Sequence, residues 1–379
     1  MRIGILTLPL HVNYGGILQA YALQTVLERM GHEVEVITLP LVKVKISFLH
    51  KIVAYPKRIL LKYLFNHKNV IVNYERRLNE SNELVQQHTK AFIRKYIHQH
   101  RVRQLSDLKE QDFDAIVVGS DQVWRKVYFT TSMEESIGNA FLQFANGWNI
   151  KRVAYAPSFG TDDWEYSLED TALCSSLAKY FDALSVREKS AIQLCKQHFG
   201  VEVCCVLDPT MLLDAQDYIP LVDLSHTLHS KGTMHCYILD TSTEKSKLID
   251  YIAAEQNLIP FFVGADTYNL QVSESERIQP PIEQWLQAFR EAKYIVTDSF
   301  HACVFSILFR KPFVVYGNKE RGMARFNSLL SLFNLQDRLV ESLEEYKQLC
   351  DIDYDAVYVK LNKMRDLSNE FLQKALEYE

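Results

Sequence analysis

YIVTDSFHAC, residues 294–303, joins an apolar run to the start of an apolar helical pattern. This order predicts a strand over residues 294–297 that feeds directly into a helix, with Asp298 or Ser299 as its N-cap. His301 then falls in the first helical turn, where free backbone N–H groups and the positive end of the helix dipole favour an anion.

Two arginines, Arg321 and Arg325, follow this helix within the reach of a loop. A planar guanidinium can bond two oxygens of a carboxylate or a phosphate at once. A histidine and two arginines around a helix N-terminus therefore predict a receptor for a small phosphorylated or carboxylated molecule.

The beginning of the chain has the same strand–helix order. Residues 3–8 are apolar, residues 17–30 have helical periodicity and end at Gly31, and residues 33–39 alternate as a strand. This predicts a β-loop-α-β unit in a parallel sheet. Further strands are predicted at residues 115–118, 152–156, 183–186 and 203–207 and, after Pro220, at 235–239, 260–263, 294–297 and 313–316.

Two consecutive α/β blocks predict two Rossmann-like domains that face a cleft. We expect an N-terminal domain over residues 1–220 on the acceptor side and a C-terminal domain over residues 221–379 on the donor side. The last helix, about residues 357–378, could cross back to the first domain. In open parallel sheets, ligands lie beyond the carboxyl ends of the strands.

The loop after the first strand carries Asn13, Gly15 and Gly16. Small residues there let the backbone approach a ligand closely, so the loop is a candidate acceptor site, although a tight turn explains it as well. The pattern is not G-x-G-x-x-G, which disfavours a nicotinamide cofactor.

A second loop, after the strand at residues 115–118, carries Asp121, Gln122 and Trp124. Asp121 is a candidate base for an acceptor hydroxyl. Gln122 and Trp124 are candidate sugar contacts, because an aromatic face packs against the C–H face of a pyranose; core packing is the alternative for Trp124. Asp208, before Pro209, is expected to form a turn.

Eight short motifs together resemble the polysaccharide pyruvyl transferase family. They follow the family's order from residue 13 to about residue 326, so the resemblance covers nearly the whole chain. The motifs are NYGG at 13–16, VGSDQVW at 118–124, AYAPSFG at 154–160, VREKS at 186–190, LDPT at 207–210, DSFH at 298–301, GNKERG at 317–322 and RF at 325–326.

The resemblance implies a GT-B type fold and transfer of pyruvate from phosphoenolpyruvate to a sugar of a surface or capsular polysaccharide precursor, which gives a cyclic ketal. His301 is then the candidate general acid, or else a ligand of the phosphate; a helix-capping or core histidine is the alternative. Some members carry an arginine two residues before this histidine, where this chain has Ser299. Lys319, Arg321 and Arg325 would supply that charge, and Ser299 would add a hydroxyl.

Composition excludes several other classes. The chain has 379 residues and a net charge of −5, which fits two domains and argues against a nucleic-acid partner. Its seven cysteines are scattered without a C-x-x-C pair, which indicates reduced thiols in a cytoplasmic protein. Neither a signal peptide nor a membrane-spanning run is recognised. We expect no metal and no cofactor.

Residues 43–77 contain nine basic residues against one acid, Glu75, with apolar residues interleaved. A basic amphipathic helix of this kind can lie on an anionic membrane, here the inner face of the cell membrane, where a lipid-linked oligosaccharide acceptor would be found. The alternative is a surface helix that packs on the first domain.

Two other functions fit the same architecture. A GT-B glycosyltransferase would use a nucleotide-sugar donor, although no clear recognition of a base or ribose stands in the sequence. A non-catalytic sugar-binding protein with two lobes would need no chemistry at His301.

Overall fold

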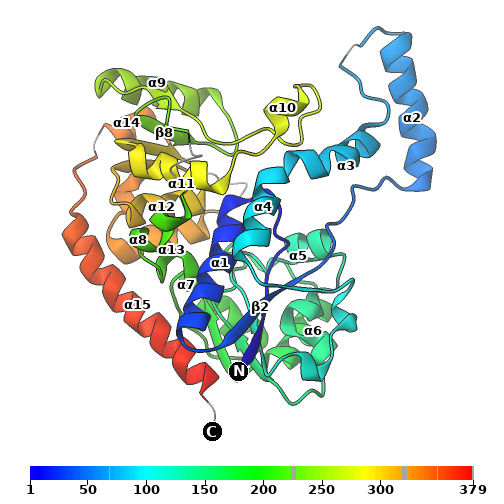
Figure 1. Cartoon of the computed structure of the whole chain (residues 1–379), viewed down its shortest axis with the longest axis vertical. Helices are drawn as coiled ribbons and strands as arrows, with labels where there is room; N and C mark the ends of the chain where they lie inside the picture. Colours follow the sequence, from blue (N-terminus) through cyan, green and yellow to red (C-terminus); the bar gives the residue numbers. More distant parts are fainter. Residues whose placement is uncertain (68, 223–227, 318–321, 348, 378–379) are drawn as a thin grey trace.

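A computed structural model describes residues 1–67, 69–222, 228–317, 322–347 and 349–377, which form two parallel sheets covered by helices (Figure 1). The first sheet has seven strands in the order β3-β2-β1-β4-β5-β6-β7, and the second has five in the order β12-β11-β10-β8-β9. Each strand pair is parallel. The predicted α/β class with two Rossmann-like sheets is therefore confirmed.

Ten of the described strands lie where apolar runs predict them, and four of these, β4, β6, β10 and β11, match to the residue. The edge strands β3 and β12 were not predicted, because they are very short and β3 reads Gln-His-Arg. The strands are β1 (Arg2–Leu6), β2 (Glu33–Thr38), β3 (Gln99–Arg101), β4 (Ala115–Val118), β5 (Lys151–Ala154), β6 (Ala183–Val186), β7 (Cys204–Cys205), β8 (Met234–Tyr237), β9 (Pro260–Phe261), β10 (Tyr294–Thr297), β11 (Phe313–Tyr316) and β12 (Leu339–Val340).

Helices separate the successive strands except β3 and β4, which are joined by two short 3-10 turns. They are α1 (Tyr14–Arg29), α2 (Phe48–Tyr63), α3 (Tyr74–Val85), α4 (Gln87–Tyr96), α5 (Lys126–Met133), α6 (Leu168–Ala178), α7 (Lys189–Leu194), α8 (Ala215–Tyr218), α9 (Thr243–Glu255), α10 (Glu274–Arg277), α11 (Ile282–Glu291), α12 (Phe300–Leu308), α13 (Ala324–Phe333), α14 (Leu343–Tyr346) and α15 (Tyr354–Leu376).

Helix α1 begins three residues earlier than its apolar period predicts. Gly15 and Gly16 therefore lie in its first turn, not in the preceding loop, and Asn13 is its N-cap. The predicted glycine loop is thus corrected to a helix N-terminus.

The two halves of the molecule share one core. Tyr14 at the start of α1 packs on Trp285 of α11 with ring centroids 5.4 Å apart, and its hydroxyl donates to the Pro280 carbonyl at 2.7 Å. Helix α15 runs along the outside from the second sheet toward the first (Figure 1). There Ser368 accepts from the Leu207 amide, and Arg365 donates to the Leu213 carbonyl. These contacts fix the faces that border the cleft.

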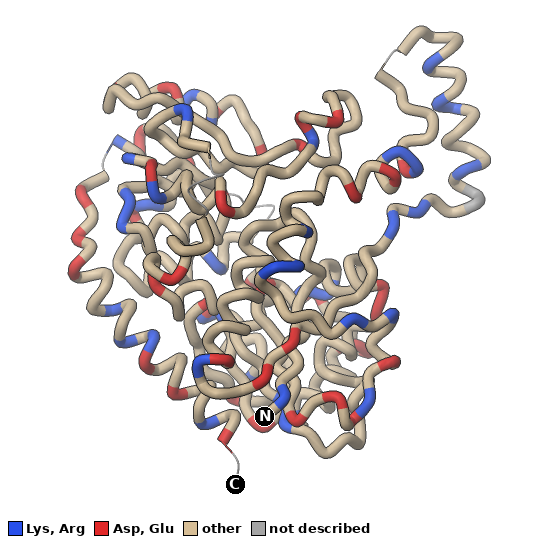
Figure 2. The backbone as a smooth tube through the Cα atoms, in the orientation of Figure 1, with Lys and Arg blue, Asp and Glu red and all other residues tan. Residues whose placement is uncertain are grey.

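The segment at residues 43–77, here called the arm, extends away from this body with α2 at its far end (Figure 1). Six exposed apolar residues at its end share one side of the helical turn, at spacings of three, four and seven residues, as an amphipathic helix requires. They are Ile52, Val53, Ile59, Leu60, Tyr63 and Leu64. In Figure 2, the arm carries several Lys and Arg residues, coloured blue, and few Asp or Glu residues, coloured red.

One contact folds the arm onto itself. The guanidinium of Arg58 makes a two-pronged ion pair with Glu75, at 2.8 and 2.9 Å, and both side chains are partly buried. The arm is thus an amphipathic helix that packs on its own return segment and leaves its apolar stripe uncovered.

Candidate functional site

Two helix N-termini, one from each sheet, meet at the cleft. Helix α12 places His301 in its first turn, as predicted, and the imidazole lies against α1. A Cβ atom on Gly15 would fall 2.1 Å from Nδ1 of His301. Gly15 therefore provides the space in which the two helices bring His301 between the sheets.

A buried ion-pair network lies beside this histidine. Arg187, at the end of β6, donates to Asp208 at 2.6 Å and to Asp121 at 3.2 Å. The side chains of Arg187 and Asp208 are only 3% and 1% exposed. Charges this deep in a protein are tolerated only when they are paired. The network joins three strand ends of the first sheet that are far apart in the sequence.

The second sheet adds His301 and Arg325 to the network. Nε2 of His301 lies 3.7 Å from Asp208, which is an ion-pair distance for a protonated imidazole but longer than a hydrogen bond. Nη1 of Arg325, in the first turn of α13, lies 4.0 Å from Asp121. The ring of Phe300 lies under both guanidinium groups, 4.6 Å from that of Arg187 and 5.4 Å from that of Arg325.

The network sets the charges of its carboxylates. Burial would raise the pKa of Asp121, but Arg187, His301 and Arg325 outweigh it and lower the pKa below its usual value. Burial likewise opposes ionisation of Asp208, and the neighbouring His301 and Arg187 again hold the pKa lower. Both carboxylates are therefore ionised at neutral pH.

The pKa of Arg325 shifts the other way. Burial and the positive charge of Arg187 lower it to about 10, which still leaves the guanidinium charged at neutral pH. The nearby Glu188 carboxyl accepts from the Phe159 amide and from the Ser158 hydroxyl. Burial raises the pKa of Glu188, and Arg187 offsets only part of that rise.

A cavity of about 440 Å³ opens above His301, Arg325 and Asp121. It lies beyond the carboxyl ends of β1, β4 and β10, where parallel sheets hold their ligands. Four more predicted site residues line it: Asn13, Gly16, Gln122 and Ser299. Most of the predicted site residues that the structure describes thus border one space.

The remaining predicted site residues lie elsewhere. Trp124 is 1% exposed, stacks on Phe141 at 4.8 Å and donates its indole N–H to the Ala140 carbonyl, so it is a core residue and its expected sugar contact is corrected. Gly15 lies behind His301 and does not line the cavity. Lys319 and Arg321 fall outside the described residues.

Asp298, the other N-cap candidate, does not cap α12 but holds two strand ends together. Its carboxylate accepts from the amides of Leu239 and Asp240 and lies 2.7 Å from Nζ of Lys245. It ties the end of β10 to the end of β8, which leaves Ser299 as the N-cap of α12.

Sequence reasoning missed Arg187 and Asp208 as site residues. Asp208 does cap a turn, as expected, because its Oδ1 accepts from the Thr210 amide at 3.0 Å, but its Oδ2 faces Arg187 and His301. Their positions in the sequence were the available signal, because both residues directly follow predicted apolar strands, in the motifs VREKS and LDPT.

This arrangement can bind an anion and move protons. Arg325 and the N-terminus of α12 offer positive charge to the cavity, His301 can donate a proton, and Asp121 can accept one. Within the described residues, no group of three or more His, Cys, Asp and Glu side chains could hold a metal ion. No helix of the described chain is long and apolar enough to cross a membrane.

Solved structures with a similar fold are remote in sequence. UDP-GlcNAc 2-epimerase from Neisseria meningitidis, bound to UDP-GlcNAc, is 9% identical with a TM-score of 0.50, and the match covers 99% of this chain and 100% of that one. The S. aureus MnaA–UDP structure is 12% identical with a TM-score of 0.51 and coverages of 99% and 96%. These matches confirm the predicted GT-B type fold.

Among curated proteins, none matches the chain. A family model does: the model described as "Polysaccharide pyruvyl transferase" matches residues 13–320, which include the first six motifs named above and the first four residues of the motif at 317–322. The match covers most of the sequence and spans both sheets. The chain therefore belongs to the polysaccharide pyruvyl transferase family.

Proposed function

We propose that the protein transfers pyruvate from phosphoenolpyruvate to two hydroxyls of one sugar in a surface polysaccharide precursor. The observation that carries this proposal is the meeting of His301, Arg325 and the N-terminus of α12 at one cavity. Phosphoenolpyruvate carries a carboxylate and a phosphate on adjacent atoms, and cations and N–H donors suit both groups.

In the first step, His301 delivers a proton to the methylene carbon of the donor. The C2 carbon becomes cationic in character, and one sugar hydroxyl forms a C–O bond to it while its proton passes to Asp121. Asp208, ionised and 3.7 Å from Nε2, balances the charge of the protonated imidazole. In the second step, another hydroxyl forms a bond to C2 as the bond from C2 to the phosphate oxygen breaks, and the proton of that hydroxyl leaves with the phosphate. The proton held by Asp121 then returns to His301 through solvent. The products are a cyclic ketal and inorganic phosphate.

The cavity walls suggest where the two substrates lie. Ser299 and Arg325, from the second sheet's side, would hold the donor. Asn13, Gly16 and Gln122, from the first sheet's side, would face the acceptor. Lys319 and Arg321 join the proposed donor set on sequence grounds alone.

The arm is proposed to contact the anionic inner face of the cell membrane. Its exposed apolar stripe is flanked by Lys51 on one side and Lys57 on the other, so a surface with negative headgroups and apolar chains complements both features. This contact would bring the cavity to a lipid-linked oligosaccharide.

The test is transfer of label. Phosphoenolpyruvate labelled in its carbon skeleton is incubated with the protein and lipid-linked oligosaccharides from a capsule-forming bacterium, and products are read by mass spectrometry with phosphate release in parallel. The proposal expects a labelled ketal and one phosphate per ketal. Transfer of sugar from a UDP-sugar, without phosphoenolpyruvate, would instead establish the nucleotide-sugar function.

A further inference from the structure

A second cavity of about 450 Å³ adjoins the reaction cavity at the base of the arm. Both cavities are lined by Leu8 and Pro9, and the consecutive residues Ser132 and Met133 line one each. The second cavity lies beyond the carboxyl ends of β2 and β3. The two cavities therefore share a wall formed by Leu8 and Pro9.

One side of the second cavity is strongly basic. Its lining contains four basic residues, Lys43, Lys90, Arg94 and Arg101, against one acid, Glu83, in a chain whose net charge is negative. Lys90 pairs with Glu83 at 2.5 Å. The guanidinium groups of Arg94 and Arg101 make no hydrogen bond or ion pair among the residues that the structure describes, although Arg94 is near enough to Glu83 to act with Lys90 in lowering the pKa of that carboxyl. The N–H donors of both guanidinium groups are thus available to an anion.

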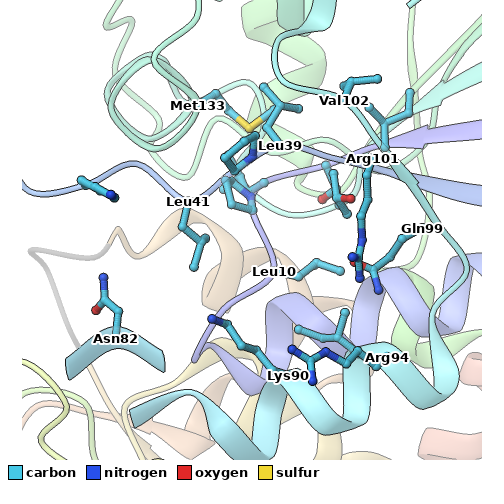
Figure 3. A pocket seen from close by; sticks show the side chains of 18 of the residues that line it. Leu10, Leu39, Leu41, Asn82, Lys90, Arg94, Gln99, Arg101, Val102 and Met133 are labelled. Atoms are coloured by element: carbon cyan, nitrogen blue, oxygen red, sulfur yellow. The ribbon is translucent and has the colours of Figure 1, made fainter. Parts of the chain in front are cut away.

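The two arginines come from different elements and approach the same space. Figure 3 shows Gln99 and Arg101 descending from β3 toward α4, which carries Arg94; the Lys90 side chain, also on α4, points away from them toward Asn82. Paired guanidinium groups on facing elements suit an anion with several oxygens, such as a diphosphate, better than a single carboxylate.

The other side of the cavity is apolar. Leu39, Leu41 and Met133 lie opposite the basic group in Figure 3, with Leu10 between the two sides. Lys43, where the arm begins, also lines the cavity. A ligand with an anionic group and an apolar continuation would match this division and would point toward the arm.

We infer that this cavity binds the diphosphate of an acceptor in which the sugar is linked through a diphosphate to a carrier. The inference rests on the proposed function for the identity of the sugar end. The shared chemistry is a sugar diphosphate, and the carrier is either an isoprenoid or a nucleoside. The apolar wall favours the isoprenoid.

The test measures binding without chemistry. Geranyl diphosphate, inorganic pyrophosphate and UDP are titrated calorimetrically into the full-length protein, with and without saturating phosphoenolpyruvate. We expect geranyl diphosphate to bind in both conditions. Arg94→Gln and Arg101→Gln should each weaken it about 10- to 100-fold, the loss expected for a charged hydrogen bond. The matched control is Arg103→Gln, which removes an exposed arginine two residues away that does not line the cavity.

Leu41→Ser separates the two carriers. It should weaken geranyl diphosphate about 3- to 10-fold, the value of one partly buried apolar side chain, and leave pyrophosphate unchanged. Tighter binding of UDP than of geranyl diphosphate, still lost in both arginine variants, would keep the diphosphate site and assign a nucleoside carrier.

Two results would overturn the inference: no diphosphate binds, or Arg94→Gln and Arg101→Gln bind diphosphates as the wild type does. A different result would contradict the proposed function without contradicting this inference. If phosphoenolpyruvate does not bind while the arginine variants still lose diphosphate affinity, the cavity assignment stands and the donor assignment is wrong.

Discussion

The reaction cavity and the arm both carry basic side chains, but they differ in what surrounds each charge. Arg187 is almost fully buried and contacts two carboxylates, whereas Lys51 and Lys57 are exposed beside uncovered apolar side chains. A buried charge is fixed in place and costly to disturb, while an exposed one is cheap to change and acts through its attraction to a partner. Substitutions in the two regions should therefore differ sharply in kind.

The largest effect is expected at His301. His301→Asn retains a hydrogen-bond donor but cannot deliver a proton, so turnover should fall about 10²- to 10⁴-fold, as the loss of a general acid usually causes. Initial rates at saturating phosphoenolpyruvate measure this change, and thermal unfolding checks the fold. A variant that turns over at nearly the wild-type rate would remove His301 from the chemical step.

Arg187→Met should lower the free energy of unfolding by about 3–5 kcal/mol, because it leaves the buried carboxylates of Asp121 and Asp208 without their cation. Urea unfolding measures it. Lys57→Met in the arm makes the same chemical change on an exposed side chain and should stay within about 0.5 kcal/mol of the wild type. If both variants lost the same free energy of unfolding, the proposed difference between buried and exposed charges would be wrong.

The buried carboxylates also predict acid sensitivity. Because the fold lowers the pKa of Asp121 and Asp208, their contribution to stability is complete above the unfolded-state pKa of about 3.9 and is lost as pH falls below it. Each group should add up to about 1.4 kcal/mol per pH unit to the slope of the unfolding free energy below pH 4. Urea midpoints from pH 5 to pH 2.5 test this, and an Asp208→Asn variant with an unchanged slope would contradict it.

The smallest effect on the folded body is expected in the arm. Reversing Lys51, Lys57 and Lys62 to Glu should change stability little, but it should abolish co-sedimentation with anionic liposomes, since each basic residue near such a surface contributes roughly 1 kcal/mol. Arg58 is left unchanged because it pairs with Glu75. Binding of the wild type should fall with salt. If the wild-type protein does not co-sediment with anionic liposomes at low salt, the arm is a packed surface helix and not a membrane contact.

The same contrast explains what the sequence could predict. Strands such as β10 and helices such as α2 follow from local apolar periodicity, and His301 follows from its place after a strand. The contact between Arg187 and Asp208 depends on the order of strands in the sheet, which no local pattern contains. Trp124 was ambiguous for a related reason: a buried aromatic residue and a sugar-binding one look alike until the neighbours are known.

Gly15 shows most clearly what the sequence alone could not predict about the site. Its sequence context predicts only that a small residue is needed there, and the tertiary structure supplies the reason, which is the His301 ring from the other half of the chain. The residues around His301 were thus predictable as candidates one by one, but their grouping was not.

Calorimetric titration of phosphoenolpyruvate into the wild type, Arg325→Gln and the exposed control Arg310→Gln tests the central claim most directly. We predict one site per chain, a loss of about 1.5–3 kcal/mol of binding free energy in Arg325→Gln, and none in the control. Equal phosphoenolpyruvate affinity in all three proteins, or no binding to the wild type, would contradict the assignment of the donor to the cavity at His301.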